Sequence, residues 1–112
     1  MNINKTDTAW QVGSTNVFAD LDMPDAKEKL IKAELVFKIN EILKQKKLTQ
    51  SEAAKLLGAD QSKISLLNRG RLSAFSIERL VKYLMLLNQD VEIVIRPAKT
   101  RSTQGILRVI YA

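Results

Sequence analysis

The 112-residue sequence contains no cysteine and no histidine. Disulfides and thiolate metal sites are therefore excluded, and the commonest general base and the commonest ligand for zinc or iron are missing too. Carboxylates, amines and hydroxyls remain, but no paired-carboxylate site, Ser-Lys pair or glycine-rich phosphate loop is evident. We expect no catalytic site, no metal site and no cofactor, so an enzyme is the least favoured class of function.

Long hydrophobic runs are also missing. Residues 1–10 are polar where a secretion signal needs an apolar stretch. No segment approaches the roughly eighteen consecutive apolar residues that suggest a membrane span. We therefore expect one cytoplasmic domain with a modest core and an additional arm, and no association with a membrane.

Charge is present but unevenly distributed. Residues 1–25 contain one lysine and four aspartates, a net charge of −3, whereas residues 26–112 contain 17 basic and 8 acidic side chains, a net charge of +9. The stretch Lys44–Lys82 has nine bases and three acids. A basic body attracts a polyanion and an acidic segment suits a basic partner, although solvated surface lysines alone would give the same count.

Hydrophobic periodicity divides the chain into three parts. Residues 1–22 lack a helical period and are predicted to form an acidic N-terminal arm, residues 23–89 a helical domain, and residues 90–112 a C-terminal β-hairpin. The first and longest helix is predicted between Asp25 and about Lys46, with a capping box formed by Asp25 and Glu28. Its apolar stripe consists of Ile31, Leu35, Ile39 and Ile42.

Two short helices are predicted next. Thr49 and Glu52 have the spacing of a capping box, and Gly58 ends that helix because glycine adopts positive φ without a Cβ penalty. Asp60 then caps a second short helix that runs to about Arg69 and stops at Gly70. Two short helices joined at a glycine are typical of a helix-turn-helix.

The last helix is predicted to begin after Ser76, with Phe75 and Leu80 as a hydrophobic staple, and to end near Asn88. After it the apolar period becomes two, which predicts a strand ended by Pro97 and a second β-prone run at Ile106–Tyr111. A two-stranded hairpin is marginal in water, so we expect these strands to complete a sheet with something else, and across a two-fold axis they would form a dimer. The dimer contacts are predicted at Leu84, Val91, Ile93 and Ile95; alternatively, the strands only cover the core of the monomer.

The second short helix carries its polar side chains at the N-terminal end and keeps Ile64 and Leu67 on the inner side. In a helix-turn-helix these leading residues enter the major groove, where Gln61 would pair with adenine and Lys63 with guanine. The predicted base-contacting residues are Gln61, Ser62, Lys63, Ser65 and Asn68, and the predicted phosphate-contacting residues are Lys44, Gln50, Lys55, Arg69 and Arg71. The alternative is a solvated helix face in an ordinary all-α domain.

The stretch "LTQSEAAKLLGADQSKISLLNRGRLSAFSIERLVKYLMLL" resembles the five-helix DNA-binding domain of the Xre, or Cro/C1-type, phage repressor family, over roughly residues 30–87. The resemblance implies a mainly α fold, the predicted β-hairpin being an addition to it, and operator contacts at Gln50, Gln61, Ser62, Lys63 and Asn68. The family often has Ser or Thr where Asp60 stands, and an acidic cap would repel phosphate. A regulator of this kind would be found on the bacterial nucleoid when bound to DNA.

A narrower resemblance involves "NVFADLDMPDAKEKLIKAEL" and "DVEIVIRP", which are similar to Xre-type antitoxins encoded beside toxins of the host-inhibition (Hig) and RelE-like kind. It implies a dimer that represses its own operon and neutralises a ribosome-dependent mRNA endonuclease. The chain departs from the pattern by continuing past Pro97 with "AKTRSTQGILRVIYA". Apolar side chains of the arm suit the binding of a small basic toxin; they are Trp10, Val17, Phe18 and Leu21. The alternative is that Phe18 and Leu21 fold back onto the first helix. The alternatives are a repressor without a toxin partner and a protein-interaction adaptor that does not bind DNA.

Overall fold

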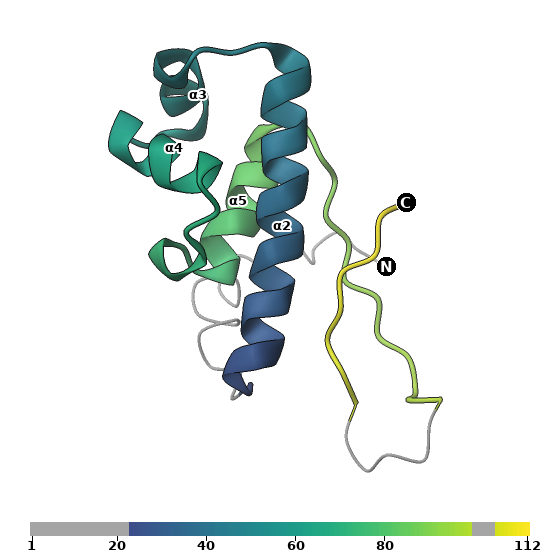
Figure 1. Cartoon of the computed structure of the whole chain (residues 1–112). Helices are drawn as coiled ribbons and strands as arrows, with labels where there is room; N and C mark the ends of the chain where they lie inside the picture. Colours follow the sequence, from purple (N-terminus) through teal and green to yellow (C-terminus); the bar gives the residue numbers. More distant parts are fainter. Residues whose placement is uncertain (1–22, 100–104) are drawn as a thin grey trace.

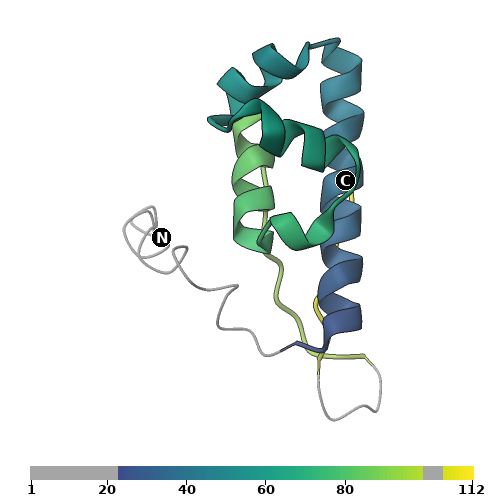
Figure 2. The ribbon, with the colours of Figure 1, turned by 60° about the vertical axis from the view of Figure 1, so that its left-hand side comes forward.

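The computed structural model describes residues 23–99 and 105–112 of the chain. The described residues contain four α-helices, α2 (Asp25–Lys46), α3 (Gln50–Leu57), α4 (Gln61–Asn68) and α5 (Ile77–Leu86), and a short 3-10 helix, η1 (Leu72–Ala74). Figure 1 shows α2 as the long element, with α5 packed alongside it and the short helices α3 and α4 at one end. The turned view in Figure 2 shows the same arrangement, with α3 and α4 crossing at an angle.

A core of apolar side chains holds the helices together. Helix α2 contributes the four residues of the predicted stripe and also Val36 and Leu43, all of them buried. The most completely buried large side chains come from four different parts of the fold and are Ile39, Ile64, Leu67, Leu80 and Leu87. Burial of each such side chain contributes about 1.5–3 kcal/mol. The predicted apolar stripe of the first helix is therefore confirmed.

The beginning of α2 differs from the prediction. Pro24 occupies the N-cap position and supplies no side-chain hydrogen bond, and Asp25 is the first helical residue. The expected capping box at Asp25 and Glu28 is wrong, because a capping box needs Asp25 outside the helix at the N-cap. Both carboxylates lie in the first turn, where they still interact favourably with the positive end of the helix dipole.

The expected count of five helices and the C-terminal hairpin require correction. The described residues contain four α-helices, and neither residues 90–99 nor residues 105–112 form a strand or a bridge. Figure 1 shows both segments as elongated stretches without sheet pairing. Alternation of apolar side chains creates a strand only where a second segment supplies the ladder of backbone hydrogen bonds, and the two segments do not form such a ladder with each other.

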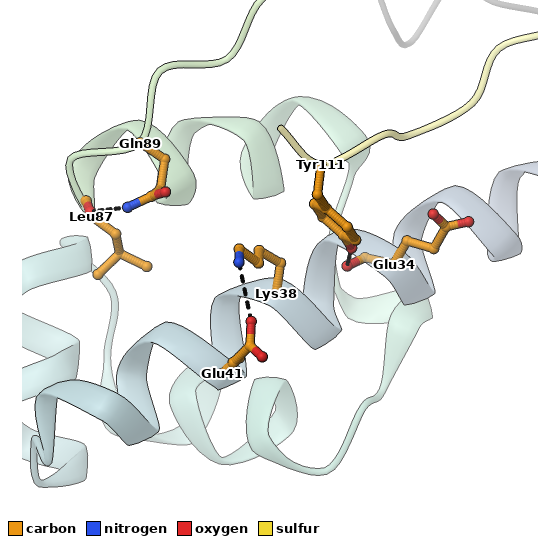
Figure 3. Close-up of polar contacts among 6 residues, drawn as sticks. All are labelled: Glu34, Lys38, Glu41, Leu87, Gln89 and Tyr111. Carbon is orange, nitrogen blue, oxygen red and sulfur yellow. Dashed lines mark hydrogen bonds and ion pairs between the residues drawn. The ribbon is translucent and has the colours of Figure 1, made fainter.

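The C-terminal segment nevertheless contacts the helical body. The Tyr111 hydroxyl donates a hydrogen bond to the backbone carbonyl of Glu34 on α2 at 2.6 Å, and the ammonium of Lys38 lies 5.4 Å from the centre of the Tyr111 ring (Figure 3). Val109 is half-buried and packs against the core. Burial raises the pKa of Tyr111, and the carboxylate of Glu34 adds to the increase. Tyr111 and Val109 therefore attach the C-terminal segment to the helical body.

Candidate nucleic-acid interface

Local interactions define both ends of α3, with a capping box at its N-terminus and a glycine at its C-terminus. Thr49 accepts a hydrogen bond from the amide of Glu52 at 3.1 Å, and the Glu52 carboxylate accepts one from the amide of Thr49 at 2.8 Å. Gly58 follows α3 with φ +66°, and a Cβ added there would meet nothing within 4 Å. The glycine is therefore needed for its left-handed conformation and not for space. The predicted capping box and the predicted role of Gly58 are confirmed.

Helix α4 begins at a capped and charged N-terminus. The Asp60 carboxylate accepts hydrogen bonds from the amide of Lys63 at 2.9 Å and from the hydroxyl of Ser62 at 2.7 Å. The Ser62 hydrogen bond and the Lys63 amide lower the pKa of Asp60, so its carboxyl stays ionised at neutral pH. The predicted cap is confirmed. The hydroxyl proton of Ser62 is already engaged within the protein.

The inner side of α4 is anchored by two kinds of contact. Ile64 and Leu67 are buried in the core. The Asn40 side chain on α2 donates from Nδ2 to the carbonyl of Leu67 at 2.9 Å, while its Oδ1 is buried and has no partner among the described residues. No role was predicted for Asn40; the signal in the sequence is a polar residue directly beside the apolar stripe position Ile39. These contacts orient α4 relative to α2.

The predicted base-contacting residues do not all have the same environment. Gln61, Ser62 and Asn68 are exposed, whereas Lys63 and Ser65 are half-buried. The Lys63 ammonium donates to the carbonyl of Ala74 at 3.2 Å and lies 5.3 Å from the centre of the Phe75 ring. Lys63 thus connects α4 to the end of η1, so its side chain is engaged within the protein.

The predicted phosphate-contacting residues are all exposed. Three of the predicted DNA contacts, from three different helices, line one shallow hollow of about 330 Å³: Lys44 of α2, Gln50 of α3 and Asn68 of α4. Asn40 also lines this hollow. Lys55, Arg69 and Arg71 are not among its lining residues. The structure therefore brings a lysine, the N-terminus of α3 and the C-terminal end of α4 to one place.

The structure describes only some of the residues that were predicted to bind partner proteins. Trp10, Val17, Phe18 and Leu21 are outside the residues that the structure describes. Val91, Ile93 and Ile95 are exposed, with Ile95 at 91% of its full accessibility, whereas Leu84 is 6% exposed and belongs to the core. Leu84 is therefore not an exposed side chain, unlike the other three. No described helix is long and apolar enough to cross a membrane.

Comparison with known proteins identifies a family and a similar solved structure. Residues 17–96 match the model of a family described as helix-turn-helix domain. A solved structure described as an XRE family transcriptional regulator superposes with a TM-score of 0.74 and is 39% identical, over 80% of this chain and 100% of that chain. No curated protein matches the chain significantly.

Proposed function

Because this chain belongs to the XRE-type helix-turn-helix family, we propose that it is a sequence-specific DNA-binding transcriptional regulator that binds its own operator as a homodimer. The observation that carries the proposal is the environment of α4. Its N-terminal residues Gln61 and Ser62 are exposed, and its opposite side is fixed in the core by Ile64 and Leu67. A polar helix end held in this way fits the major groove.

Within this proposal the side chains fall into two groups. Gln61 and Asn68 are free to contact base edges, and Lys63 reaches a base after it releases the carbonyl of Ala74. Around them the exposed Arg69 and Arg71, the exposed Lys55 and the hollow lined by Lys44 and Gln50 bind the phosphate backbone. Phosphate contacts add affinity and salt dependence without reading the sequence.

The division is tested by fluorescence anisotropy with duplexes from the region upstream of the gene. Gln61→Ala is expected to cost about 1–3 kcal/mol and to relax selectivity at one base pair. Arg71→Ala is expected to weaken binding to all sequences and to reduce the slope of log K against log salt by about one. If both variants change selectivity and salt slope alike, the division into reading and phosphate-binding residues is wrong.

A protein-interaction adaptor with the same fold is the alternative from another class. The discriminating measurement is a gel shift at moderate salt, with the upstream region as specific probe and shuffled DNA as competitor. Selective retention of the upstream probe supports the regulator. No shift, or the same shift with every sequence, would favour the adaptor.

The finer proposal is that the regulator is also the antitoxin of a small basic mRNA endonuclease of the Hig or RelE-like kind. It is supported by the net charge of −3 on residues 1–25, against +9 on the remainder, and by the apolar side chains in the arm. An acidic segment with an aromatic anchor suits a basic toxin, since charge speeds the encounter and the aromatic ring supplies binding energy.

This finer proposal is tested by co-expression with the product of the adjacent reading frame. The full chain is expected to co-purify with that product and to prevent its inhibition of growth, and a variant lacking residues 1–22 is expected to do neither. The control is gel-shift activity of the shortened variant, which should persist because residues 1–22 precede all described helices. If the adjacent product is not retained, the protein is a repressor without a toxin partner.

A further inference from the structure

The segment after α5 exposes apolar side chains in a regular pattern. Between Gln89 and Pro97 the chain forms no strand or bridge, and no backbone hydrogen bond joins residues 91–97 to another described residue. Ile93, Val94 and Ile95 are 72%, 62% and 91% exposed. A segment with unpaired backbone groups and exposed β-branched side chains can form a sheet when a strand from another chain pairs with it.

The charges of this segment are self-complementary. In an extended strand Glu92, Val94 and Arg96 lie on one face and Val91, Ile93 and Ile95 on the other. If two copies pair antiparallel with Val94 on the two-fold axis, Glu92 lies opposite Arg96 of the partner subunit, and Arg96 lies opposite the partner's Glu92. On the other face Ile93 lies opposite the partner's Ile95.

Other registers are less favourable. A shift of the pairing by one residue places Glu92 opposite the partner's Ile95, so that charged and apolar side chains share a face. Placing Ile93 on the axis leaves Glu92 opposite Val94, and placing Ile95 on the axis leaves Arg96 opposite Val94. Of the symmetric pairings, the one centred on Val94 pairs both Glu92 and Arg96 with an opposite charge.

We propose that residues 91–97 form an antiparallel two-stranded sheet with the same residues of a second copy, with Val94 on the two-fold axis. The inference names the contact behind the homodimer in the proposed function, but its test requires no DNA. A two-stranded sheet is marginal by itself, so its apolar face must pack on further apolar surface. The described residues offer such surface at Phe37 of α2 and Ile110, which are 66% and 64% exposed.

Charge reversal tests the register by analytical ultracentrifugation at low salt. Glu92→Arg and Arg96→Glu are each expected to weaken dimerisation about tenfold or more, because each substitution places two pairs of like charges directly opposite each other. The double variant is expected to restore the dimer to within about threefold of the wild type. Circular dichroism controls for folding, since both positions lie outside the helices.

Asp90→Arg is the matched control for this experiment, because it makes the same change in charge in the same segment. In the proposed register Asp90 lies opposite Ala98, so dimerisation should change less than about threefold. With Ile93 on the axis, Asp90 would lie opposite the partner's Arg96. A large loss of dimerisation with Asp90→Arg and a small loss with Glu92→Arg would therefore indicate that register and overturn the proposal. A monomeric wild type at tens of micromolar, or dimers unaffected by all three single variants, would also overturn it.

A second test uses the absence of cysteine from the chain. A residue on the axis faces its own copy at about 4.5–5.5 Å between Cβ atoms. Val94→Cys is therefore expected to form a disulfide-linked dimer on mild oxidation much faster than Ile95→Cys, which faces Ile93. Equal rates would contradict the register. A variant that dimerises normally but fails to bind the operator would contradict the DNA-binding proposal and leave this one intact.

Discussion

At the scale of single residues, two side chains position α4, the helix that is proposed to read the DNA sequence. Asn40 joins α2 to the last turn of α4, and Lys63 joins the first turn of α4 to the end of η1. Asn40 and Leu67 are 27 positions apart in the sequence. Periodicity identifies which face of a helix is buried, but a polar contact between distant elements depends on the packed fold. Asp60 was predictable because its partners lie two and three residues away.

Asn40 gives the first prediction. Asn40→Ala should lower the free energy of unfolding by about 0.5–1.5 kcal/mol, because one hydrogen bond is lost while the Leu67 carbonyl keeps the one from the Gly70 amide. Asn40→Asp should cost more, since it replaces the donor with a charged acceptor that faces a carbonyl. Urea denaturation measures both. The exposed Gln45→Ala on the same helix is the control and should stay within about 0.5 kcal/mol. Equal stability of the two Asn40 variants would contradict this account.

Asp60 gives the second prediction. Replacement by Asn keeps a side-chain oxygen that can accept the hydrogen bond from the Lys63 amide and removes a negative charge beside the proposed DNA surface. Asp60→Asn is expected to strengthen binding to all duplexes, with the largest gain at low salt, where repulsion of phosphate is least screened. Anisotropy titrations at two salt concentrations measure the gain. Asp25→Asn, at the start of α2, is the control and should have little effect; an equal gain with both variants would show a general effect of net charge.

At the scale of elements, helix boundaries were predicted well where short-range capping determines them. Thr49, Ser76 and Gly58 have the expected roles, and each acts through partners within four residues along the chain. The C-terminal strands were predicted from alternation alone and are not formed in the described residues. A helix satisfies its backbone internally, whereas a strand requires a partner that alternation does not specify.

The helix-ending glycines give the third prediction. Gly58 and Gly70 have φ of +66° and +71°, and a Cβ at either position would meet nothing within 4 Å. Gly58→Ala and Gly70→Ala should each lower the free energy of unfolding by about 1–2 kcal/mol through backbone strain alone. Gly105→Ala is the control, because its φ is outside the positive range and its surroundings are open. A cost at Gly58 well above this range would indicate crowding at the turn.

At the scale of the whole molecule, the side chains whose pKa values change on folding indicate the range of pH in which the fold is most stable. The pKa of Asp60 is lowered on folding. Asp60 therefore contributes to the free energy of unfolding above its ordinary pKa, and this contribution is lost as pH falls through the pKa of the folded state. Burial raises the pKa of Tyr83 and of Tyr111. The two tyrosines contribute to the free energy of unfolding below the ordinary tyrosine pKa of 10.0, and this contribution is lost as pH rises through their pKa values in the folded state.

The fourth prediction follows from these signs. The midpoint of urea denaturation should be flat between about pH 5 and pH 9 and should fall on both sides. Tyr111→Phe should lessen the decrease on the alkaline side, because it removes one of the two shifted phenols. It should also lower stability at neutral pH by about 0.5–1.5 kcal/mol through loss of the hydrogen bond to the Glu34 carbonyl. An unchanged alkaline limb in this variant would show that Tyr111 is not held against α2 in solution.

The eight residues of α4 are too few for a stable isolated helix in water, since such helices are marginal below about 12–15 residues. The links from Asn40 and Lys63, together with the buried Ile64 and Leu67, order it before any duplex arrives. Little conformational entropy would then remain to be lost on association. Calorimetry with DNA should accordingly give a heat-capacity change that matches rigid-body burial at the contact surface, without the additional component of coupled folding.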